Sequence, residues 1–374
     1  MAHVIVIGAG LGGVPAAFDL RKHLPKTHRV TLIGARPYFE FTPSNPWIAA
    51  GWRSSDETRV TMQGPLERKG VEWPVNTVTQ IDADNSTLTL DDGKQLHYDY
   101  LVIATGPRLT FEEVPGLGPD GFTQSVCSQD HSVLAWQRYQ EFLKSPGPIV
   151  GDSTGLMESE LREHHIKWIT NAKMTSVTAN EMTVQELDES GVLKKEHKLP
   201  FAFSAVIPAF KGVDAVAGVP GLCNPRGFVL IDKHQRSPKY PKIFSVGVCV
   251  AIPPVEATPV ATGAPKTGYM IESMVSATAA NIVAELAGKP AQAEATWNAI
   301  CLADFGDTGA AFVALPQIPP RGVTWSRKGK WVHLAKIAFE KYFMRKVRTE
   351  SLTPVYETYV LKALGIMSLK RRAS

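Results

Sequence analysis

The sequence is poor in cysteine and in excess charge of either sign. Its 374 residues include only four cysteines, which lie far apart and form no C-x-x-C pair, so the pattern predicts neither a disulfide framework nor a zinc site. Lysine and arginine number 40 against 36 aspartates and glutamates, and the net charge of +4 is too even for a dedicated nucleic-acid-binding protein. We therefore expect no metal and no nucleic acid, and thiols that are free to react.

Long hydrophobic runs are missing as well. No stretch approaches the roughly 18 to 20 apolar residues that cross a bilayer, so we expect membrane contact only at the surface. The chain opens Met-Ala-His and passes directly into the apolar run 4–7, which leaves no room for a signal peptide. We therefore expect no export. At about 150 residues per domain, the length predicts two or three domains.

The N-terminus does contain a nucleotide-binding fingerprint. The β-branched run 4–7 leads into a G-x-G-x-x-G turn formed by Gly8, Gly10 and Gly13, and residues 15–20 follow as a predicted helix. Gly8 allows the tight turn, Gly10 lets the backbone approach a pyrophosphate, and Gly13 lets the helix pack close to the strand. The pattern predicts an α/β domain of the Rossmann type that binds a dinucleotide, the alternative being a glycine-rich turn without a ligand.

The acidic residue that usually follows the second strand of this fingerprint is absent. The predicted strand 29–33 ends in Gly-Ala-Arg, where an Asp or Glu normally binds the ribose hydroxyls. Arg36 is a candidate for an adenine or phosphate contact, and it is equally well explained as a solvated loop arginine.

Small residues follow the next strand of the predicted sheet. A hairpin with an Asp-Gly turn is predicted over 87–98, and the strand 100–103 then ends in Ala104, Thr105 and Gly106. Residues of this size let the backbone lie against a bound nucleotide. The segment resembles the A-T-G segment of flavoproteins with two dinucleotide domains.

Two later segments predict further flavin contacts. A strand ending at Gly247 resembles the second flavin segment of the same superfamily, although Val248 stands where an Asp is usual. Lys266, Thr267 and Gly268 then precede a predicted helix. The start of such a helix, with a lysine beside it, would stabilise negative charge at the flavin N1–C2 carbonyl, and an ordinary helix cap is the alternative.

Several segments together resemble the bacterial sulfide:quinone oxidoreductases, over nearly the whole chain. Those that carry the likeness are 127–131, 208–212, 227–229, 252–256, 263–272 and 331–336. The resemblance implies an FAD held noncovalently or through a thioether, cysteines that oxidise sulfide to zero-valent sulfur, and a membrane quinone that removes the electrons. It leaves open whether the chain forms a homo-oligomer.

The resemblance also assigns three catalytic residues. Cys301 matches the family cysteine of the flavin-facing sulfur site, and Cys127 matches the one near the flavin methyl edge, with His131 four residues later. A thiolate at these positions would take up sulfur and pass electrons to the flavin. Taken alone, each cysteine is more often a small buried hydrophobic residue.

One segment of the family is missing after residue 150. The segment 146–150 resembles the strand that opens the family's second nucleotide-type domain, but residues 151–155 (Gly-Asp-Ser-Thr-Gly) follow at once in place of a βαβ unit of roughly 30 residues or more. In the family this segment carries the second sulfur-site cysteine and a further histidine, which therefore have no counterpart. Cys249 would replace that cysteine only if it points into the cavity. We predict a truncated second domain, with a helix over 156–165 and strands over 166–174 and 182–186, and severely impaired sulfide oxidation.

The C-terminal region predicts contact with a membrane surface. Residues 327–348 carry eight basic side chains against one acidic, with apolar residues near a 3.6 period, and 355–367 predicts a second amphipathic helix. Basic amphipathic helices bind anionic lipid, although such a helix also packs on the core of its own protein. Phe339 and Tyr356 match the aromatic pair that holds the quinone ring in the family, and Lys336 matches a residue near it.

The complete prediction is a peripheral flavoprotein of the bacterial inner membrane. We expect an FAD domain formed by 1–110 and 238–325, a truncated Rossmann-like domain over 111–237, and a membrane-associating region over 326–374. Two alternatives stay open. A type II NADH:quinone oxidoreductase should keep a second glycine fingerprint, which the sequence lacks after residue 150, whereas an inactive flavin- or quinone-binding homologue is favoured by the missing cysteine segment.

Overall fold

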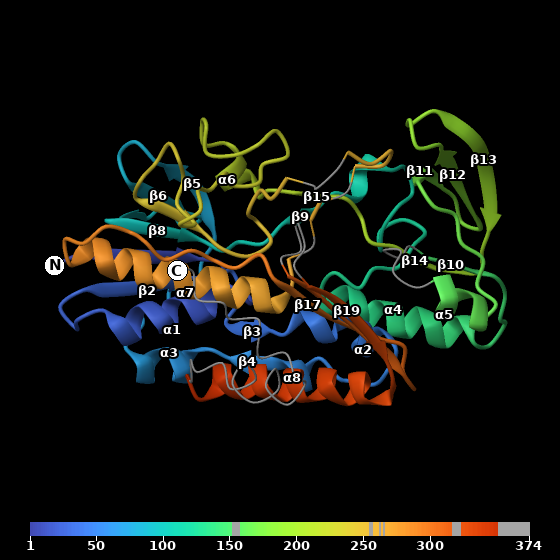
Figure 1. Cartoon of the computed structure of the whole chain (residues 1–374), viewed down its shortest axis with the longest axis horizontal. Helices are drawn as coiled ribbons and strands as arrows, with labels where there is room; N and C mark the ends of the chain where they lie inside the picture. Colours follow the sequence, from blue (N-terminus) through green and yellow to red (C-terminus); the bar gives the residue numbers. More distant parts are fainter. Residues whose placement is uncertain (152–157, 254–256, 262, 265, 316–322, 351–374) are drawn as a thin grey trace.

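Figure 1 shows the computed structural model of the protein. It describes all residues except 152–157, 254–256, 262, 265, 316–322 and 351–374. The predicted helix 355–367 and Tyr356 lie outside the described residues.

A parallel four-stranded sheet forms the centre of the molecule. Its strands have the order β16-β8-β1-β2, with β1 at His3–Ile7, β2 at Arg29–Ile33, β8 at Tyr100–Ile103 and β16 at Ile243–Ser245. Alternate residues of β1 enter two separate cores, one containing Val4 and Val6 and the other Ile5 and Ile7. The sheet is therefore covered on both faces, as the continuous β-branched runs predict, and the predicted mixed α/β fold is confirmed.

Helices cover one face of this sheet and smaller elements cover the other. On the first face, α1 (Gly13–His23) packs against α7 (Gly268–Leu286), and α3 (Gln63–Lys69) lies beside them. The other face carries the hairpin strands β5 (Val78–Asp82), β6 (Thr87–Leu90) and β7 (Gln95–His97) with α6 (Asp214–Ala217). Short elements that connect them are β3 (Tyr38–Glu40), η1 (Thr42–Ser44), α2 (Asn45–Ala49), η2 (Asp56–Thr58) and β4 (Arg59–Thr61).

The middle section forms small separate sheets. Strand β10 (Ile149–Gly151) pairs in parallel with β14 (Phe203–Ala205), and β11 (Ala172–Val177), β12 (Glu181–Leu187) and β13 (Leu193–Pro200) form an antiparallel sheet. The remaining elements are β9 (Arg108–Leu109), η3 (Phe111–Glu113), α4 (Gln129–Phe142), α5 (Glu158–Glu163) and β15 (Phe210–Lys211).

Two predicted elements of this section differ in their bounds. The helix predicted over 156–165 is described only as α5, because 156–157 lie outside the described residues and the helix ends at Glu163. The strand predicted over 166–174 is wrong in its first half, since β11 begins at Ala172. Ile166 and Trp168 are 51% and 36% exposed, so no neighbouring strand covers this stretch and the apolar pattern alone does not make it a strand.

The C-terminal part begins with an antiparallel sheet of β17 (Ala299–Asp304), β18 (Gly309–Leu315) and β19 (Val323–Lys328), followed by helix α8 (Lys330–Arg348). The helix predicted from residue 327 therefore starts three residues later, because Arg327 and Lys328 pair with β18. Helix α8 packs against β17, β18 and β4. Among the described helices, none is long and apolar enough to span a membrane.

The basic face predicted for the last helix is smaller than the sequence indicates. Lys346 is buried and pairs with the buried carboxylate of Glu272 on α7. Burial also lowers the pKa of Lys336, whose side chain points toward the protein. Removing either partner of this buried ion pair would leave the other charge buried without compensation. The pair therefore fixes α8 against α7.

Candidate active site

The glycine turn after β1 brings three backbone segments into contact. Gly8 has a φ of +100°, and a Cβ added there would lie 2.3 Å from the carbonyl oxygen of Ala104, while a Cβ on Gly13 would lie 1.7 Å from the Gly8 oxygen. For Gly10, in contrast, no described residue beyond its two chain neighbours comes within 4 Å of an added Cβ. The N-cap of α1, Gly12, makes no side-chain hydrogen bond, and no acidic residue stands in the first turn. This open, uncapped helix start fits the pyrophosphate of FAD.

Two further glycines lie at the same edge of the sheet. Gly106 follows β8 with a φ of +67°, and Gly247 follows β16 with a φ of +87°. Apart from the chain neighbours, no atom of the described part of the chain lies within 4 Å of a Cβ added at either glycine. Thr105 stands between Ala104 and Gly106. Because the carboxyl ends of parallel strands form the binding edge of such a sheet, these positions also fit a nucleotide lying against the backbone.

The start of α7 carries a positively charged neighbour. Thr267 is the N-cap, and its hydroxyl accepts a hydrogen bond from the Met270 N–H at 3.4 Å, with Gly268 beginning the helix. The Lys266 ammonium lies 5.5 Å from the centre of the Phe228 ring. Burial lowers the pKa of Lys266. A lysine and a helix N-terminus placed together suit negative charge on a flavin ring.

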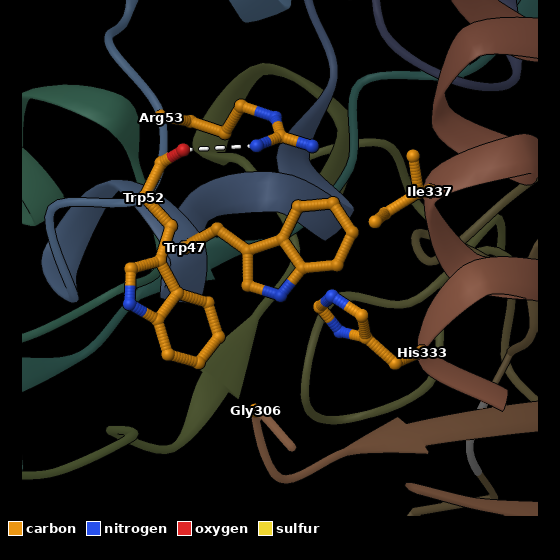
Figure 2. A pocket seen from close by; sticks show the side chains of 6 residues that line it. All are labelled: Trp47, Trp52, Arg53, Gly306, His333 and Ile337. Carbon is orange, nitrogen blue, oxygen red and sulfur yellow. Dashed lines mark hydrogen bonds between the residues drawn. The ribbon is translucent and has the colours of Figure 1, made fainter. Parts of the chain in front are cut away.

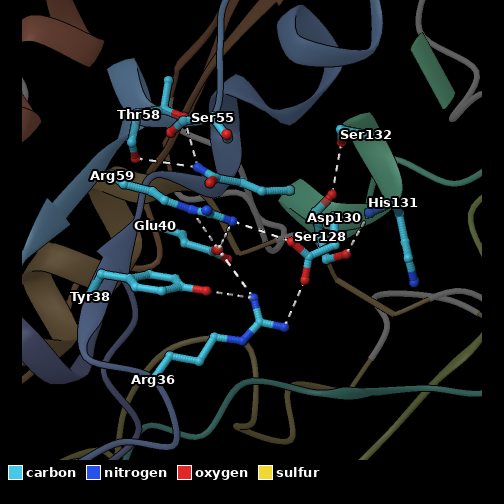
Figure 3. Close-up of polar contacts among 11 residues, drawn as sticks. Arg36, Tyr38, Glu40, Ser55, Thr58, Arg59, Ser128, Asp130, His131 and Ser132 are labelled. Atoms are coloured by element: carbon cyan, nitrogen blue, oxygen red, sulfur yellow. Dashed lines mark hydrogen bonds and ion pairs between the residues drawn. The ribbon is translucent and has the colours of Figure 1, made fainter. Parts of the chain in front are cut away.

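Arg36 belongs to a network of ion pairs shown in Figure 3. Its guanidinium lies 3.2 Å from Glu40 and 3.0 Å from Asp130, and Arg59 contacts the same two carboxylates at 3.0 and 3.3 Å. The Arg59 guanidinium also lies 4.6 Å from the Tyr38 ring centre. The network joins the segment after β2 to the first turn of α4. Arg36 is therefore held by two protein carboxylates. It also follows the carboxyl end of β2, at the edge of the sheet where a nucleotide would bind.

Cys127 and His131 flank the first turn of α4. Cys127 precedes the N-cap Ser128, whose hydroxyl accepts a hydrogen bond from the His131 N–H at 3.1 Å. The imidazole packs edge-on against Phe111, with ring centres 5.7 Å apart, and its buried Nδ1 has no hydrogen-bond partner within the described structure. Burial lowers the pKa of His131, which favours the neutral ring. A buried nitrogen of this kind is available to a ligand.

Cys301 and Lys336 lie close together where β17 faces α8. Cys301 stands opposite Phe312 in the sheet, and burial raises the pKa of its thiol while the charge of Lys336 opposes that rise. The Lys336 ammonium lies 5.0 Å from the Trp47 ring centre. Burial therefore favours the protonated thiol of Cys301, and the charge of Lys336 offsets part of this effect.

Phe339 contacts the start of α7. A Cβ added to Gly268 would lie 3.1 Å from the tip of the Phe339 ring, and this ring also packs on Phe41 and Phe343, with centres 5.9 and 6.0 Å apart. A predicted quinone residue and a predicted flavin residue are therefore neighbours, although they stand 71 positions apart in the sequence.

Of the two other cysteines, Cys249 lies in the hydrophobic core and the half-buried Cys223 packs against the same core. Cys249 is 1% exposed, and its Sγ lies 3.4 Å from the Ser245 hydroxyl and 3.5 Å from the Ile103 carbonyl oxygen. Burial raises its pKa, and burial raises the pKa of Cys223 to about 11. Cys249 thus points into the core. In this orientation its thiol does not take the place of the missing sulfur-site cysteine. No group of three or more His, Cys, Asp or Glu in the described part of the chain could hold a metal.

Figure 2 shows a cavity to which no sequence motif points. Its volume is about 230 Å³. It is lined by Trp47, Trp52, Arg53, Gly306, His333 and Ile337. The buried Asp304 carboxylate accepts hydrogen bonds from Trp47 Nε1 at 2.7 Å and His333 Nδ1 at 3.0 Å. These residues come from three distant segments, so no spacing in the sequence brings them together. The only available signal is that 331–336 is among the segments that carry the family resemblance.

Comparisons with known proteins agree over most of the chain. Residues 2–142 match the family model described as pyridine nucleotide-disulphide oxidoreductase. The sulfide-quinone reductase of Aquifex aeolicus is 34% identical over 96% of this chain and 94% of its own length. An X-ray structure of the Aquifex aeolicus sulfide:quinone oxidoreductase superimposes with a TM-score of 0.90, covering 97% of this chain and 95% of that one.

More distant relatives share parts of the sequence or the fold alone. A mouse mitochondrial sulfide:quinone oxidoreductase is 22% identical over 67% of this chain and 66% of its own length. The structure of Plasmodium falciparum NDH2 in complex with NADH has a TM-score of 0.69 at 15% identity, over 90% of this chain and 94% of that one. The alignment with the Aquifex sequence spans 414 positions against 374 residues here, so that relative contains residues with no counterpart in this chain.

Proposed function

Because this chain belongs to the sulfide-quinone reductase family, we propose that it oxidises sulfide to zero-valent sulfur and passes the electrons through FAD to a quinone. The observation that carries this proposal is the Aquifex match, which extends over 96% of the chain at 34% identity and includes the C-terminal region. A relationship of this extent covers both the glycine turn and the sulfur and quinone residues, whereas the glycine turn alone is common to many flavoproteins.

The residues proposed to hold FAD line the carboxyl edge of the central sheet. The uncapped start of α1 and the open backbone at Gly10 would bind the pyrophosphate, with Gly8 and Gly13 holding the turn. Other proposed FAD contacts are Arg36, Ala104, Thr105, Gly106, Gly247, Lys266, Thr267 and Gly268. When bound, FAD supplies the two-electron chemistry that connects sulfide oxidation to quinone reduction.

The residues proposed for sulfur chemistry are Cys301, Cys127 and His131. Hydrosulfide becomes zero-valent sulfur when it gives up two electrons and one proton. Cys301 would take up this sulfur as a thiolate; burial raises the pKa of its thiol, and the positive charge of Lys336 offsets part of that rise. Cys127 and His131 would lie near the methyl edge of the flavin ring. The buried Nδ1 of His131 is available there to hold a proton.

A flavin spectrum tests the proposed function. Purified protein, refolded or supplemented with FAD where needed, should show the visible flavin bands and lose them when sulfide is added without oxygen, while NADH should leave them unchanged. Bleaching by NADH instead would assign the chain to the NADH:quinone oxidoreductases. Failure to bind any flavin would remove the basis of the proposal.

Phe339 is proposed as one wall of the quinone site, with Lys336 beside it and Tyr356 opposite. Replacing Phe339 by Ala removes an aromatic face and should raise the KM for quinone about tenfold, equivalent to about 1.4 kcal/mol. Flavin content should not change, because Gly268, which the ring contacts, is not altered. Steady-state quinone reduction is the measurement, and Phe339→Tyr, which keeps the ring, is the matched control. Unchanged quinone kinetics in Phe339→Ala and Tyr356→Ala would assign both rings to core packing.

Helix α8 is proposed to hold the protein on an anionic membrane surface. Its exposed residues form one stripe, Lys330, Leu334, Ala338, Lys341, Arg345 and Arg348. Leu334 is 64% exposed, so the stripe combines an apolar centre with basic ends. We place this surface on a bacterial inner membrane, and the segment 355–367 is proposed to extend it.

Charge reversal in this stripe should weaken membrane binding. The double variant Lys341→Glu with Arg345→Glu should lose about 2 kcal/mol or more of binding to anionic vesicles, at about 1 kcal/mol per basic residue, and salt should reduce the difference. Vesicle sedimentation measures this. Lys94→Glu with Lys195→Glu is the matched control, because both lysines are exposed, Lys94 between β6 and β7 and Lys195 on β13. Figure 1 shows β6 and β13 away from α8. Equal binding by both double variants would contradict the placement of the membrane surface.

An inactive flavin- or quinone-binding homologue is the second candidate function. The observation in its favour is that neither Cys249, which is buried in the core, nor Cys223, which is half-buried against the same core, offers an accessible thiol in place of the missing family cysteine. The rate of flavin reduction by sulfide separates the two candidates.

A further inference from the structure

A buried tryptophan joins helix α2 to the last sheet and to α8. Trp47 is 3% exposed, and its Nε1–H donates a hydrogen bond of 2.7 Å to the carboxylate of Asp304 on β17. Two cations lie against its ring, with the Arg53 guanidinium 4.8 Å and the Lys336 ammonium 5.0 Å from the ring centre. Figure 2 shows the ring of Trp47 between the side chains of Arg53 and His333. A single indole therefore connects three elements that are far apart in the sequence.

The carboxylate of Asp304 fixes the orientation of this indole. Its side chain is only 1% exposed, and it also accepts hydrogen bonds from the Gly306 N–H at 3.1 Å and from His333 Nδ1 at 3.0 Å. Burial on its own would raise the pKa of Asp304, but the hydrogen bonds from Gly306, His333 and Trp47 outweigh it and lower this pKa. A carboxylate held in this way stays charged, and the indole N–H that it binds cannot turn away without leaving it unpaired.

Arg53, the first of the two cations, has a carboxylate of its own. Its Nε lies 3.0 Å from the buried Glu340 on α8, and Glu340 also accepts a hydrogen bond from the Ser44 hydroxyl. The charge of Arg53 is therefore compensated by Glu340, and the position of its guanidinium does not depend on the indole alone.

The second cation, Lys336, depends on the indole. Within the described part of the chain, its ammonium forms no hydrogen bond or ion pair, and the ring of Trp47 is its contact. Burial lowers the pKa of Lys336, and the charges of Asp304, Cys301 and Glu340 oppose this change. An aromatic face attracts an ammonium only while the ammonium is charged, and the attraction is strongest where water is excluded. The indole therefore stabilises both the position and the charge of Lys336.

The charge of Lys336 acts in turn on Cys301. Burial raises the pKa of this thiol, and Lys336 opposes the rise. Helices α7 and α8 both pack against β17, which carries the cysteine. The other charged groups where these elements meet have partners, which are Asp304 with His333, Glu340 with Arg53, and Glu272 with Lys346. Lys336 is therefore the cation through which the surrounding residues affect the thiol.

We propose that Trp47 is a positioning residue, which holds the Lys336 ammonium beside the Cys301 thiol and so sets how readily this cysteine ionises. The inference rests on the proposed function, in which Cys301 takes up sulfur as a thiolate. Trp47 itself would not touch sulfide, and it would act only through Lys336. Without the ring, the ammonium would move away from the thiol, the pKa of Cys301 would rise further, and the fraction of thiolate at a given pH would fall.

Fluorination of the indole tests this role without removing the side chain. Tryptophans with increasing numbers of ring fluorines are introduced at position 47 of the full chain with its FAD. Each fluorine weakens the attraction of the ring face for a cation and changes the shape of the ring little. Alkylation of Cys301 by iodoacetamide, measured by mass spectrometry across a range of pH, reports the thiolate fraction. At about pH 8 the rate should fall with each fluorine, by about fivefold for the most fluorinated ring, and the midpoint of the pH profile should move upward.

Substitutions provide a second measurement. Trp47→Phe keeps an aromatic face and should slow alkylation less than Trp47→Leu, which removes it. In a Lys336→Met background, neither change should slow alkylation further, because the cation through which Trp47 acts is already absent. Trp168→Leu is the matched control, since the Trp168 ring also lies under a guanidinium, that of Arg162 at 5.5 Å, in the middle section of the chain. This variant should alkylate as the wild type does.

Three results would overturn the proposal. The first is alkylation that does not respond to fluorination, and the second is an equal effect of the Trp47 variants with and without Lys336. The third is faster alkylation at every pH, which would show that the ring only covers the thiol. Alkylation needs neither sulfide nor quinone, so these outcomes are independent of turnover. Failure of sulfide to reduce the flavin would count only against the proposed function.

Discussion

Anaerobic sulfide should bleach the flavin of this chain slowly, and sulfide-dependent quinone reduction should fall below about 1 per second, the lower end of ordinary enzyme turnover. Zero-valent sulfur leaves the first cysteine when a second thiol attacks it. Cys301 has no such partner from the missing segment, and Cys249 is 1% exposed in the core. Stopped-flow absorbance in sealed cells measures both rates. Turnover of tens per second or more would show that another residue replaces the missing thiol, and Cys127 would be the first candidate.

The slow reaction that is left should depend on Cys301. Cys301→Ser should abolish sulfide-driven bleaching, because a serine hydroxyl neither ionises to a comparable nucleophile nor forms a persulfide. Cys223→Ser is the matched control, since that thiol is half-buried, donates to the Val216 carbonyl oxygen and has its pKa raised to about 11. Bleaching that survives in Cys301→Ser would move the sulfur site to another residue.

The elements with local signals were predictable from the sequence. The strands at 4–7 and 29–33, the hairpin after residue 87 and the helix after Gly268 are confirmed. Each depends on a run of apolar residues or on a glycine turn, and both act within a few residues. The start of α8 was not predictable in this way, since basic residues at 327 and 328 continue the helical pattern, and only the pairing with β18 makes them a strand.

The residues of the candidate site likewise separate into those with a local sequence signal and those without one. The roles of the candidate cysteines, glycines and aromatic residues came from local motifs and the family resemblance, and they stay predictions. Asp304 and His333 could not be predicted as a pair, because they lie on different elements 29 positions apart and each is unremarkable in its own segment. Lys346 shows the reverse case, since a basic residue at a helical surface spacing proves to be buried against Glu272. Tertiary packing, which no window of sequence contains, decides both.

Replacing Gly10 should separate FAD binding from folding. In Gly10→Ala, the affinity for FAD should fall at least tenfold, because the added methyl group would meet the ligand: among the described residues, none beyond the two chain neighbours has an atom within 4 Å of that position. The stability of the FAD-free protein should change by no more than about 1 kcal/mol, and a small gain is expected from the reduced freedom of the unfolded chain. Equilibrium dialysis with FAD and thermal unfolding of the FAD-free protein are the measurements.

The neighbouring Gly13 provides the control, because its replacement should affect folding as well as FAD binding. A Cβ there would lie 1.7 Å from the backbone oxygen of Gly8, so Gly13→Ala should both destabilise the FAD-free protein and abolish FAD binding. If Gly10→Ala binds FAD as tightly as the wild type, the pyrophosphate does not lie against this turn. If Gly10→Ala instead unfolds together with Gly13→Ala, the turn is packed against protein, and the open space at Gly10 that fits a dinucleotide does not exist in solution.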